Sequence, residues 1–156
     1  MLLINTKDSE LIKGFMLKDE VWCSFTDDVS SKEEYQPDIS TRSCWLKVVI
    51  DDHVVGLVLI DNYNLTTLKM HPYLLKGYRE YSRRLIKRVL VIFMKTPDFI
   101  NKLVVEIPFH RRIVYNLAKK TGFIDEGVNR KSFLKNGIYY DQWNLGLTKE
   151  EIKGLL

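Results

Sequence analysis

The hydrophobic positions between residues 65 and 108 change their spacing twice. Apolar residues lie at Leu65, Leu68 and Met70 within Leu65–His71, recur every three to four positions from about Tyr78 to Lys95, and crowd together over Lys102–Ile107. The two short segments are interpreted as strands, whereas the longer stretch with helical spacing favours an amphipathic helix. Two strands joined by a helix cannot pair as a hairpin, so the pattern predicts two parallel strands in a βαβ unit. Pro72 lacks an N–H and is expected to end the ladder of the first strand.

A basic turn separates the first of these strands from the helix. The segment from Lys76 to Arg84 reads KGYREYSRR. The N–H groups that open a helix have no partner within it, and the helix dipole is positive there, so this turn favours a phosphate. The basic residues continue along the helix to Lys87 and Arg88. A solvated helix face is therefore an equal alternative.

Short apolar runs and turn residues predict the remaining elements. Before the βαβ unit they first predict a strand at Leu2–Asn5 and a helix that begins near Ser9 and is capped by Thr6 and Asp8. A short helix over Val21, Trp22 and Phe25 and a loop over Thr26–Arg42 follow. Two strands, at Cys44–Ile50 and Val54–Asp61, come next. After the βαβ unit they predict a helix at His110–Thr121 that Gly122 closes. Strands at Phe123–Leu134 and Ile138–Leu147 follow, joined by an Asn-Gly turn. A last helix at Thr148–Leu156 begins with a capping box. Gly56 marks a bulge or a close approach within its strand.

This order predicts an α/β (α+β) protein with a mixed central sheet of about six to seven strands flanked by helices. A length of 156 residues predicts one domain over 1–156. The net charge of +4 and pI of about 9.0 suit an anionic ligand, although solubility alone would explain them. Cys23 and Cys44 lie outside any metal-ligand spacing, so we expect no metal site and reduced thiols in the cytoplasm. The sequence predicts neither a signal peptide nor a membrane span.

Several polar side chains interrupt or follow the predicted strands. Glu106 lies within the run LVVEIP, so its carboxylate either faces a cleft, where it would be a general base, or forms a salt bridge with a lysine or arginine. His71 and His110 follow two strands at the same sheet edge, where either would suit a base or a proton shuttle, or serve as a surface or capping residue. Tyr139 and Tyr140 face opposite sides of their strand, so one is expected in the core and the other at a cleft.

The C-terminal stretch LAKKTGFIDEGVNRKSFLKNGIYYDQWNLGL resembles the GNAT superfamily of acyl-CoA-dependent N-acetyltransferases. The matching positions are Gly122, Phe123, Glu126, Gly127, Arg130, Gly137, Tyr139 or Tyr140, and Asp141. The resemblance covers roughly Cys44 to Leu147. It is closest to small GNAT-like proteins carried by tailed phages, some of which are labelled head-assembly proteins.

The resemblance implies an N-acetyltransferase that uses acetyl-CoA, with direct attack by the amine and no covalent enzyme intermediate. The family binds the CoA pyrophosphate through Arg/Gln-x-x-Gly-x-Gly/Ala after its fourth strand, and the segment here departs from that motif. The implied cofactor-binding residues are Met70, His71, Tyr78, Arg79, Glu80, Tyr81, Ser82, Arg83 and Arg84. The implied catalytic residues are Glu106, Tyr115 and His71. Tyr115 lies three residues before Ala118, where the family often has the tyrosine that protonates the thiolate.

Two other functions stay open. The segment at residues 76–84 lacks the full glycine motif, and Arg111 and Ala118 stand where the family often has asparagine and tyrosine. These departures suit a non-catalytic phage protein that binds a virion protein, for example during head assembly in the host cytoplasm. Nucleic-acid binding through the basic helix face ranks last, because no nucleic-acid motif accompanies it and Glu80 interrupts it.

Overall fold

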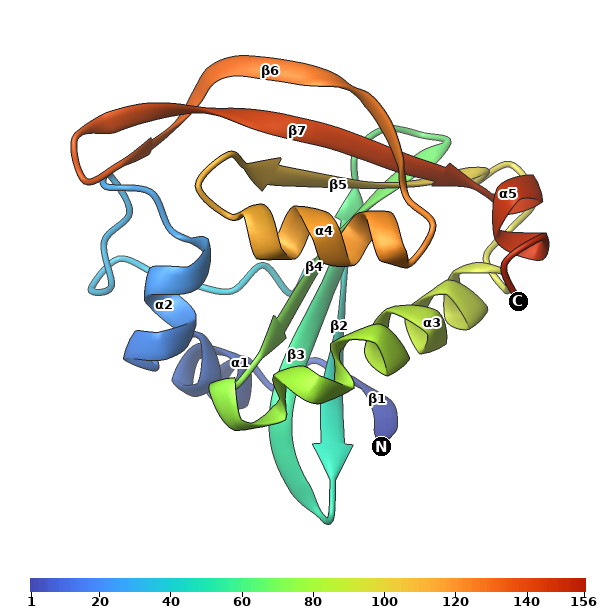
Figure 1. Cartoon of the computed structure of the whole chain (residues 1–156). Coiled ribbons are helices and arrows are strands. Elements are labelled where there is room, and N and C mark those ends of the chain that lie inside the picture. The colour runs from blue at the N-terminus through green and yellow to red at the C-terminus, as the bar shows by residue number, and fades with distance from the viewer. The chain divides into compact units, whose positions relative to one another are not determined.

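The computed structural model describes residues 1–156, and its elements follow the predicted order (Figure 1). The strands are β1 (Leu2–Thr6), β2 (Ser43–Ile50), β3 (His53–Asn62), β4 (Thr67–Leu74), β5 (Lys102–Pro108), β6 (Ile124–Lys135) and β7 (Ile138–Thr148). The helices are α1 (Ser9–Met16), α2 (Asp19–Phe25), the 3-10 segment η1 (Lys76–Tyr81), α3 (Ser82–Phe93), α4 (Arg112–Lys120) and α5 (Lys149–Lys153). The seven strands form a mixed sheet in the order β1-β2-β3-β4-β5-β7-β6, which confirms the predicted fold class.

The chain falls into two compact units. Unit 1 comprises Met1–Asp61 and Met70–Glu80, and unit 2 comprises Asn62–Lys69 and Tyr81–Leu156. Strand β4 contributes to both, because its first three residues pair with β5 in unit 2. None of the helices is long and apolar enough to cross a membrane.

Unit 1 is built on the antiparallel strands β1, β2 and β3. Asp51 and Asp52 join β2 to β3 with φ angles of +47° and +62°, a two-residue turn that allows Ile50 to pair with His53. Helices α1 and α2 contribute apolar side chains to a core with Trp45 and Leu57. Asp8 caps α1 as predicted, because its carboxylate accepts a hydrogen bond from the Leu11 amide at 3.0 Å.

Gly56 fulfils both roles that its sequence position suggested. The pairing of β2 with β3 shifts register between Val48 and Val49, opposite Gly56 and Val54, which is a β-bulge. A Cβ atom at Gly56 would lie 2.5 Å from the Tyr73 carbonyl oxygen and 2.6 Å from Cδ2 of Leu74. Only glycine lets the backbone of β3 pass so close to that of β4.

The predicted end of β4 is wrong. The strand continues through Pro72 to Leu74, and the next amide, Leu75 N–H, donates to the Val55 carbonyl at 3.0 Å. Pro72 is exposed. A proline is tolerated within a strand where its missing N–H would not have served the ladder, so Pro72 does not break the strand.

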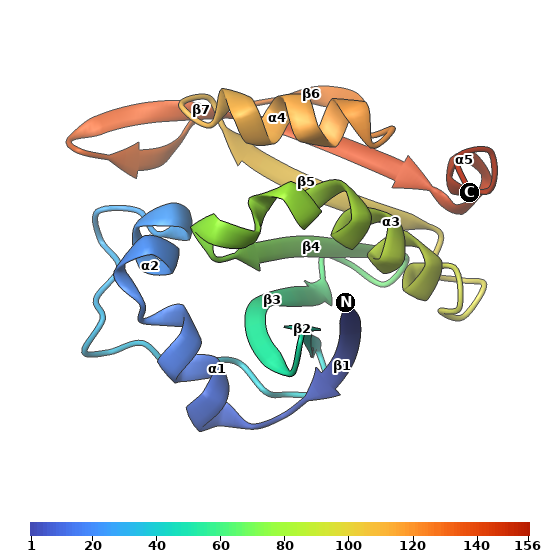
Figure 2. The same ribbon diagram turned by 60° about the horizontal axis from the view of Figure 1, so that its bottom comes forward.

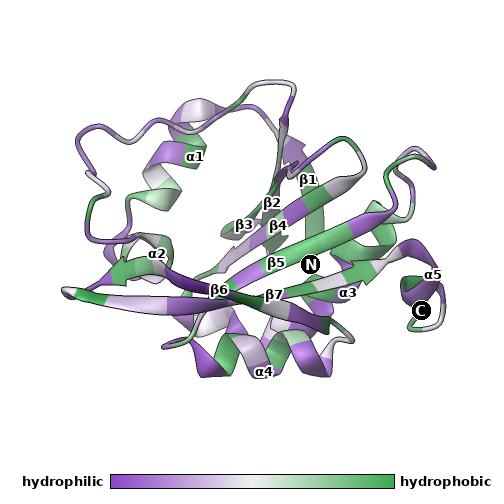
Figure 3. Ribbon diagram, turned by 90° about the horizontal axis from the view of Figure 1, so that it is seen from above, coloured by the Kyte–Doolittle hydropathy of each residue, from purple (hydrophilic) through white to green (hydrophobic).

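Unit 2 is built on β5, β7 and β6, with α4 against one face of these strands (Figures 1 and 2). Leu103, Val105 and Ile107 of β5 are buried, and Figure 3 shows this strand largely in the hydrophobic colour. Asn136 and Gly137, with φ angles of +51° and +71°, make the predicted two-residue turn between β6 and β7.

The helix ends of unit 2 follow their sequence patterns. Gly122 has a φ of +102° and closes α4, while the Phe123 amide donates to the Ala118 carbonyl, as in a Schellman motif. Thr148 and Glu151 form the predicted capping box of α5. Helix α3 begins four residues later than predicted, at Ser82, because residues 76–81 form the tighter η1 segment.

Candidate functional site

The parallel ladder between β4 and β5 is short. It joins three residue pairs, the last of which is Lys69 with Val104, although β5 continues to Pro108. The Lys102 amide donates toward the Thr66 carbonyl, whereas the Phe109 amide donates to the Asp141 carbonyl beside β7. Backbone groups alternate in direction along a strand. The N–H and C=O of Glu106 therefore face away from β7, just beyond the end of the ladder.

The Glu106 side chain forms an ion pair with Lys69, in which Oε2 accepts a hydrogen bond from Nζ. Both side chains are about one-fifth exposed, at 21% and 22%. The structure thus provides the lysine partner that one of the two sequence interpretations expected. Lys69 itself was not singled out from the sequence, because the two residues are 37 positions apart.

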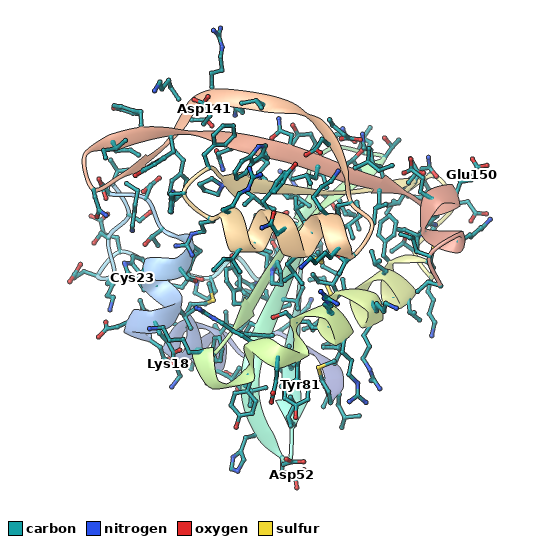
Figure 4. The ribbon with its side chains drawn as sticks, viewed as in Figure 1. Lys18, Cys23, Asp52, Tyr81, Asp141 and Glu150 are labelled. Atoms are coloured by element: carbon teal, nitrogen blue, oxygen red, sulfur yellow. The ribbon has the colours of Figure 1, made fainter.

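The basic turn is helical in the structure. Residues 76–81 form η1, which ends at Tyr81, labelled in Figure 4. Tyr81 is also the N-cap of α3 and has a helical backbone with φ −79° and ψ −3°. At the start of η1 the Lys76 amide donates to the Glu20 carboxylate at 2.8 Å. The expected basic turn is therefore a 3-10 helix, and its first amide already donates to an anionic side chain of the same unit.

The cofactor-binding candidates divide between the two units. Unit 1 contains Met70, His71, Tyr78, Arg79 and Glu80, and unit 2 contains Tyr81, Ser82, Arg83 and Arg84. Arg83 and Arg84 are exposed in the first turn of α3. Their role in cofactor binding stays a prediction.

Tyr115 lies on α4 in a polar and aromatic cluster of unit 2. Its hydroxyl donates to Oδ2 of Asp125 at 3.1 Å, and its ring lies 4.3 Å from that of Trp143, between centroids. The Lys119 ammonium bonds to the same carboxylate oxygen at 2.7 Å, and this hydrogen bond is the main cause of the lowered pKa of Asp125. The arrangement holds the Tyr115 hydroxyl against a carboxylate that stays ionised near neutral pH.

The two histidines have separate surroundings. In unit 1, Nε2 of His71 lies 3.4 Å from Oδ1 of Asp61. In unit 2, the His110 ring lies 4.7 Å from that of Tyr140. Burial lowers the pKa of His110, with smaller contributions from Arg111 and Lys135, so His110 is more readily neutral than an ordinary histidine. No group of His, Cys, Asp and Glu side chains is arranged to hold a metal ion.

Trp45 is buried, whereas Trp143 is only partly buried. The Trp143 ring stacks on Phe109 with a centroid distance of 4.0 Å, and the Arg112 guanidinium lies 5.4 Å from its centre. Trp143 is therefore part of the cluster around Tyr115.

A second feature of unit 2 was not visible in the sequence. An open depression of about 510 Å³ lies between α3 and the end of α4. We call it the basic groove, and its lining residues are Arg83, Arg84, Lys87, Arg88, Val91, Lys120, Thr121 and Leu156. The sequence placed the first four on one helix face, but nothing in the linear pattern connected them with Lys120.

The two units also differ in charge. Unit 2 has 16 lysines and arginines and 7 acidic residues, which gives a formal charge of +9. Unit 1 has 8 lysines and arginines and 13 acidic residues, which gives a formal charge of −5. The two values sum to the +4 of the whole chain. The mild overall charge therefore conceals a strongly basic unit and an acidic one.

Comparison with solved structures finds a similar architecture in two forms of a spermidine N-acetyltransferase. A chimera of the spermidine N-acetyltransferase SpeG from Vibrio cholerae with hSSAT has a TM-score of 0.79 at 15% sequence identity, covering 98% of this chain and 99% of that one. SpeG from Vibrio cholerae in complex with CoA and spermine also has a TM-score of 0.79, at 16% identity and with 97% of each chain covered.

No protein-family model and no curated protein sequence matches the chain. The chain therefore has the GNAT fold. These comparisons offer nothing for the expected likeness to phage head-assembly proteins, which stays a prediction.

Proposed function

We propose that the protein is an acyltransferase that moves an acetyl group from acetyl-CoA to an amine. The observation that supports this most directly is the short β4–β5 ladder, which leaves backbone groups of β5 beyond it, in a fold shared with a CoA-bound N-acetyltransferase. The structural similarity to SpeG, which extends over nearly the whole chain, supports the same proposal of acetyl transfer.

The residues of unit 2 suit an anionic thioester. The Glu106 backbone N–H and C=O offer a donor and an acceptor of the kind that an amide-containing arm would use. Arg83 and Arg84 offer guanidinium groups to phosphates. Tyr81 and Ser82 complete the unit 2 candidates at the start of α3, and Met70, His71, Tyr78, Arg79 and Glu80 remain candidates from unit 1. When bound, acetyl-CoA would supply an acetyl group already activated as a thioester.

Two side chains have the chemistry for the proton transfers. An amine nucleophile must lose a proton as its bond to the acetyl carbon forms, and the Glu106 carboxylate is the candidate acceptor of that proton. The sulfur that leaves needs a proton, and the Tyr115 hydroxyl is the candidate donor. Lys69 and Asp125 position these two groups through the ion pair and the hydrogen bond described above. His71 remains the alternative base, with Asp61 beside its imidazole.

Cationic amines are the first acceptors to assay. The formal charge of −5 on unit 1 would attract a cation, and the SpeG structure with CoA also holds spermine. Spermidine, spermine and simple diamines are therefore suitable substrates for a first panel.

Calorimetric titration with acetyl-CoA, followed by measurement of thiol release in the presence of these amines, tests the proposal. We expect saturable binding and release of CoA that depends on the amine. Absence of binding at millimolar acetyl-CoA would remove the enzymatic function and favour a non-catalytic protein-binding role. Thiol release that does not change when the amine is omitted would show hydrolysis instead of transfer.

A further inference from the structure

The amine of Lys69 lies where β4 and β5 stop pairing. Lys69 and Val104 form the last pair of the parallel ladder, although β4 continues to Leu74 and β5 to Pro108. Residues in register on neighbouring strands point to the same side of a sheet, as do residues two apart on one strand. The side chains of Lys69, Val104 and Glu106 therefore share one face, at the open end of the ladder.

This face of β5 differs from the opposite one. Leu103, Val105 and Ile107 alternate with the positions on this face, and all three are buried. The side chains of Lys69 and Glu106, in contrast, stay about one-fifth exposed. Nζ of Lys69 donates a hydrogen bond to Oε2 of Glu106. The amine is thus partly accessible and already bonded to the candidate base.

The hydrogen bond to Glu106 gives the Lys69 amine what it needs in order to attack a thioester. A lysine amine in water is protonated at neutral pH and has no free electron pair. Transfer of one proton from Nζ to Oε2, along the hydrogen bond that already exists, leaves a neutral amine beside a protonated carboxyl group. The ion pair therefore contains both a nucleophile and the base that activates it.

The open end of the ladder is also where the proposed acetyl donor would lie. The Glu106 N–H and C=O face away from β7 and lie beyond the last β4–β5 pair, so they are the backbone groups proposed to hold an amide-containing arm. The side chain of the same residue joins these groups to the Lys69 amine. An amine held beside its reaction partner needs no separate encounter, which raises its rate above that of an amine free in solution.

We propose that Lys69 is a site of self-acetylation. Nζ would attack the carbonyl carbon of the acetyl thioester, so that the C–N bond of an amide forms while the C–S bond breaks. Nζ loses two protons in this step. Glu106 takes the first and releases it to solvent, and the second goes to the sulfur, so the products are an acetylated Lys69, a free thiol and one proton. The inference rests on the proposed acetyl transfer and adds to it an acceptor within the chain itself.

Acetylation would change the site that carries it. An acetylated lysine has no positive charge, so the modified side chain no longer forms an ion pair with Glu106. Because an amide is far less reactive than a thioester, the acetyl group would stay on Lys69 instead of passing to another amine. Self-acetylation is therefore a lasting modification of the ion pair, distinct from a covalent intermediate in the transfer to free amines.

Lys102 provides the matched comparison within the chain. It lies on β5, faces the same side of the sheet as Glu106, and forms an ion pair with Glu126. It belongs to the first pair of the ladder, with Thr67, and lies about 13 Å along the strand from Glu106. Lys102 therefore has a carboxylate partner but lies at the closed end of the ladder. We expect acetylation at Lys69 and none above background at Lys102.

The test incubates the full chain with acetyl-CoA that carries a deuterated acetyl group and locates the label by peptide mass spectrometry. We expect label at Lys69, added with a rate constant that stays the same over about a tenfold range of protein concentration, as for a step within one molecule. Glu106→Gln should slow the labelling about 10²-fold, a usual contribution of a general base. Lys69→Arg should abolish it, because a guanidinium stays protonated, and Lys102→Arg should leave it unchanged. Circular dichroism of the variants checks that the fold is retained.

The outcomes separate self-acetylation from acetyl transfer in general. Equal labelling of Lys69, Lys102 and the exposed lysines would show unassisted chemical acetylation and overturn the proposal. A rate constant at Lys69 that rises with protein concentration would show transfer between molecules and would also overturn it. Thiol release that depends on a free amine, with no label on Lys69, would refute self-acetylation and leave acetyl transfer supported. Failure of acetyl-CoA to bind would refute acetyl transfer itself and self-acetylation with it.

Discussion

At the scale of single residues, the pair formed by Lys69 and Glu106 connects the two parallel strands of unit 2. Each side chain is about one-fifth exposed, so each charge has lost much of its contact with water. Such a pair contributes little net stability when intact, but removal of one partner leaves the other poorly solvated. The same carboxylate is the candidate base, so structure and catalysis have to be separated experimentally.

Substitution of Lys69 separates these roles. Lys69→Met should lower the free energy of unfolding by about 1–3 kcal/mol, because it leaves the Glu106 carboxylate without its partner. Glu106→Gln should be milder for stability but should lower kcat by about 10²-fold or more if Glu106 is the base. Urea unfolding and steady-state rates provide the two measurements. Equal kcat values for Glu106→Gln and the wild type would leave the carboxylate a purely structural partner.

At Tyr115, removal of the hydroxyl oxygen separates a structural role of that group from a catalytic one. Tyr115→Phe keeps the ring beside Trp143 and removes the hydroxyl that donates to Asp125. We expect a loss of stability of about 0.5–1.5 kcal/mol, typical of one hydrogen bond. If the hydroxyl protonates the sulfur, kcat should fall at least tenfold with little change in KM. An unchanged kcat would show that the hydroxyl has only a structural role, as a hydrogen bond between α4 and β6.

Gly56 has a role that depends on backbone spacing. Gly56→Ala would place Cβ within 2.5 Å of the Tyr73 carbonyl oxygen, so the strands would have to move apart. We expect a loss of about 1–3 kcal/mol in the free energy of unfolding. Gly14→Ala is the control, because a Cβ added there would meet no side chain or distant backbone within 4 Å and alanine favours the interior of α1. That control should stabilise by about 0.5–1 kcal/mol, as measured by the midpoint of urea unfolding.

At the scale of elements, helix α2 and the strand β4 share an aromatic cluster in unit 1. The Phe25 ring lies 5.2 Å from that of Tyr73 and 6.3 Å from that of Tyr35. Burial raises the pKa of Tyr35 to about 12 and raises that of Tyr73 further. Both hydroxyls therefore stay protonated at a pH where an unfolded chain would ionise them.

The raised pKa values of these tyrosines predict that the free energy of unfolding falls at alkaline pH. The folded state has the higher pKa, so the contribution of each tyrosine is complete below about pH 10 and is lost as the pH rises through the folded value. Tyr35→Phe should reduce the slope of unfolding free energy against pH between about pH 10 and 12, while stability at pH 7 changes little. Urea unfolding at a series of pH values measures the slope. An unchanged slope would contradict the assignment.

At the scale of the whole molecule, charge is segregated between the two units. Under the proposed acetyl transfer, the basic unit would suit the phosphates of the acyl donor and the acidic unit would suit a cationic acceptor. A ligand that binds only the folded chain also stabilises it, by about 2.7 kcal/mol at a concentration of 100 times Kd. Binding of acetyl-CoA should therefore raise the melting temperature.

A thermal-shift series tests this effect. Acetyl-CoA should raise Tm in a concentration-dependent way, and the rise should shrink at high salt because the phosphates contribute through exposed cations. S-acetylpantetheine, which lacks the nucleotide phosphates, is the matched control and should stabilise much less. Equal shifts for the two compounds would show that the basic residues of unit 2 do not contact the donor.

The elements and their ends were largely determined by local sequence. Asn136-Gly137, the capping box at Thr148 and the closure of α4 at Gly122 each depend on neighbours within a few residues, so they could be predicted from the chain alone. The parallel pairing of β4 and β5 followed from the helix between them. The start of α3 was misplaced because helical periodicity does not distinguish a 3-10 turn from the first turn of an α-helix.

The contacts of the candidate site were decided by tertiary structure. Lys69 reaches Glu106 across 37 positions, and Lys120 joins a groove whose other cations lie on α3. Such contacts depend on how strands pair and helices pack, which the spacing of apolar residues constrains only loosely. The sequence alone therefore determined which kinds of side chain were present and on which elements. Only the folded chain decided which charges are neutralised and which remain available to a ligand, because ion pairing depends on distance in space.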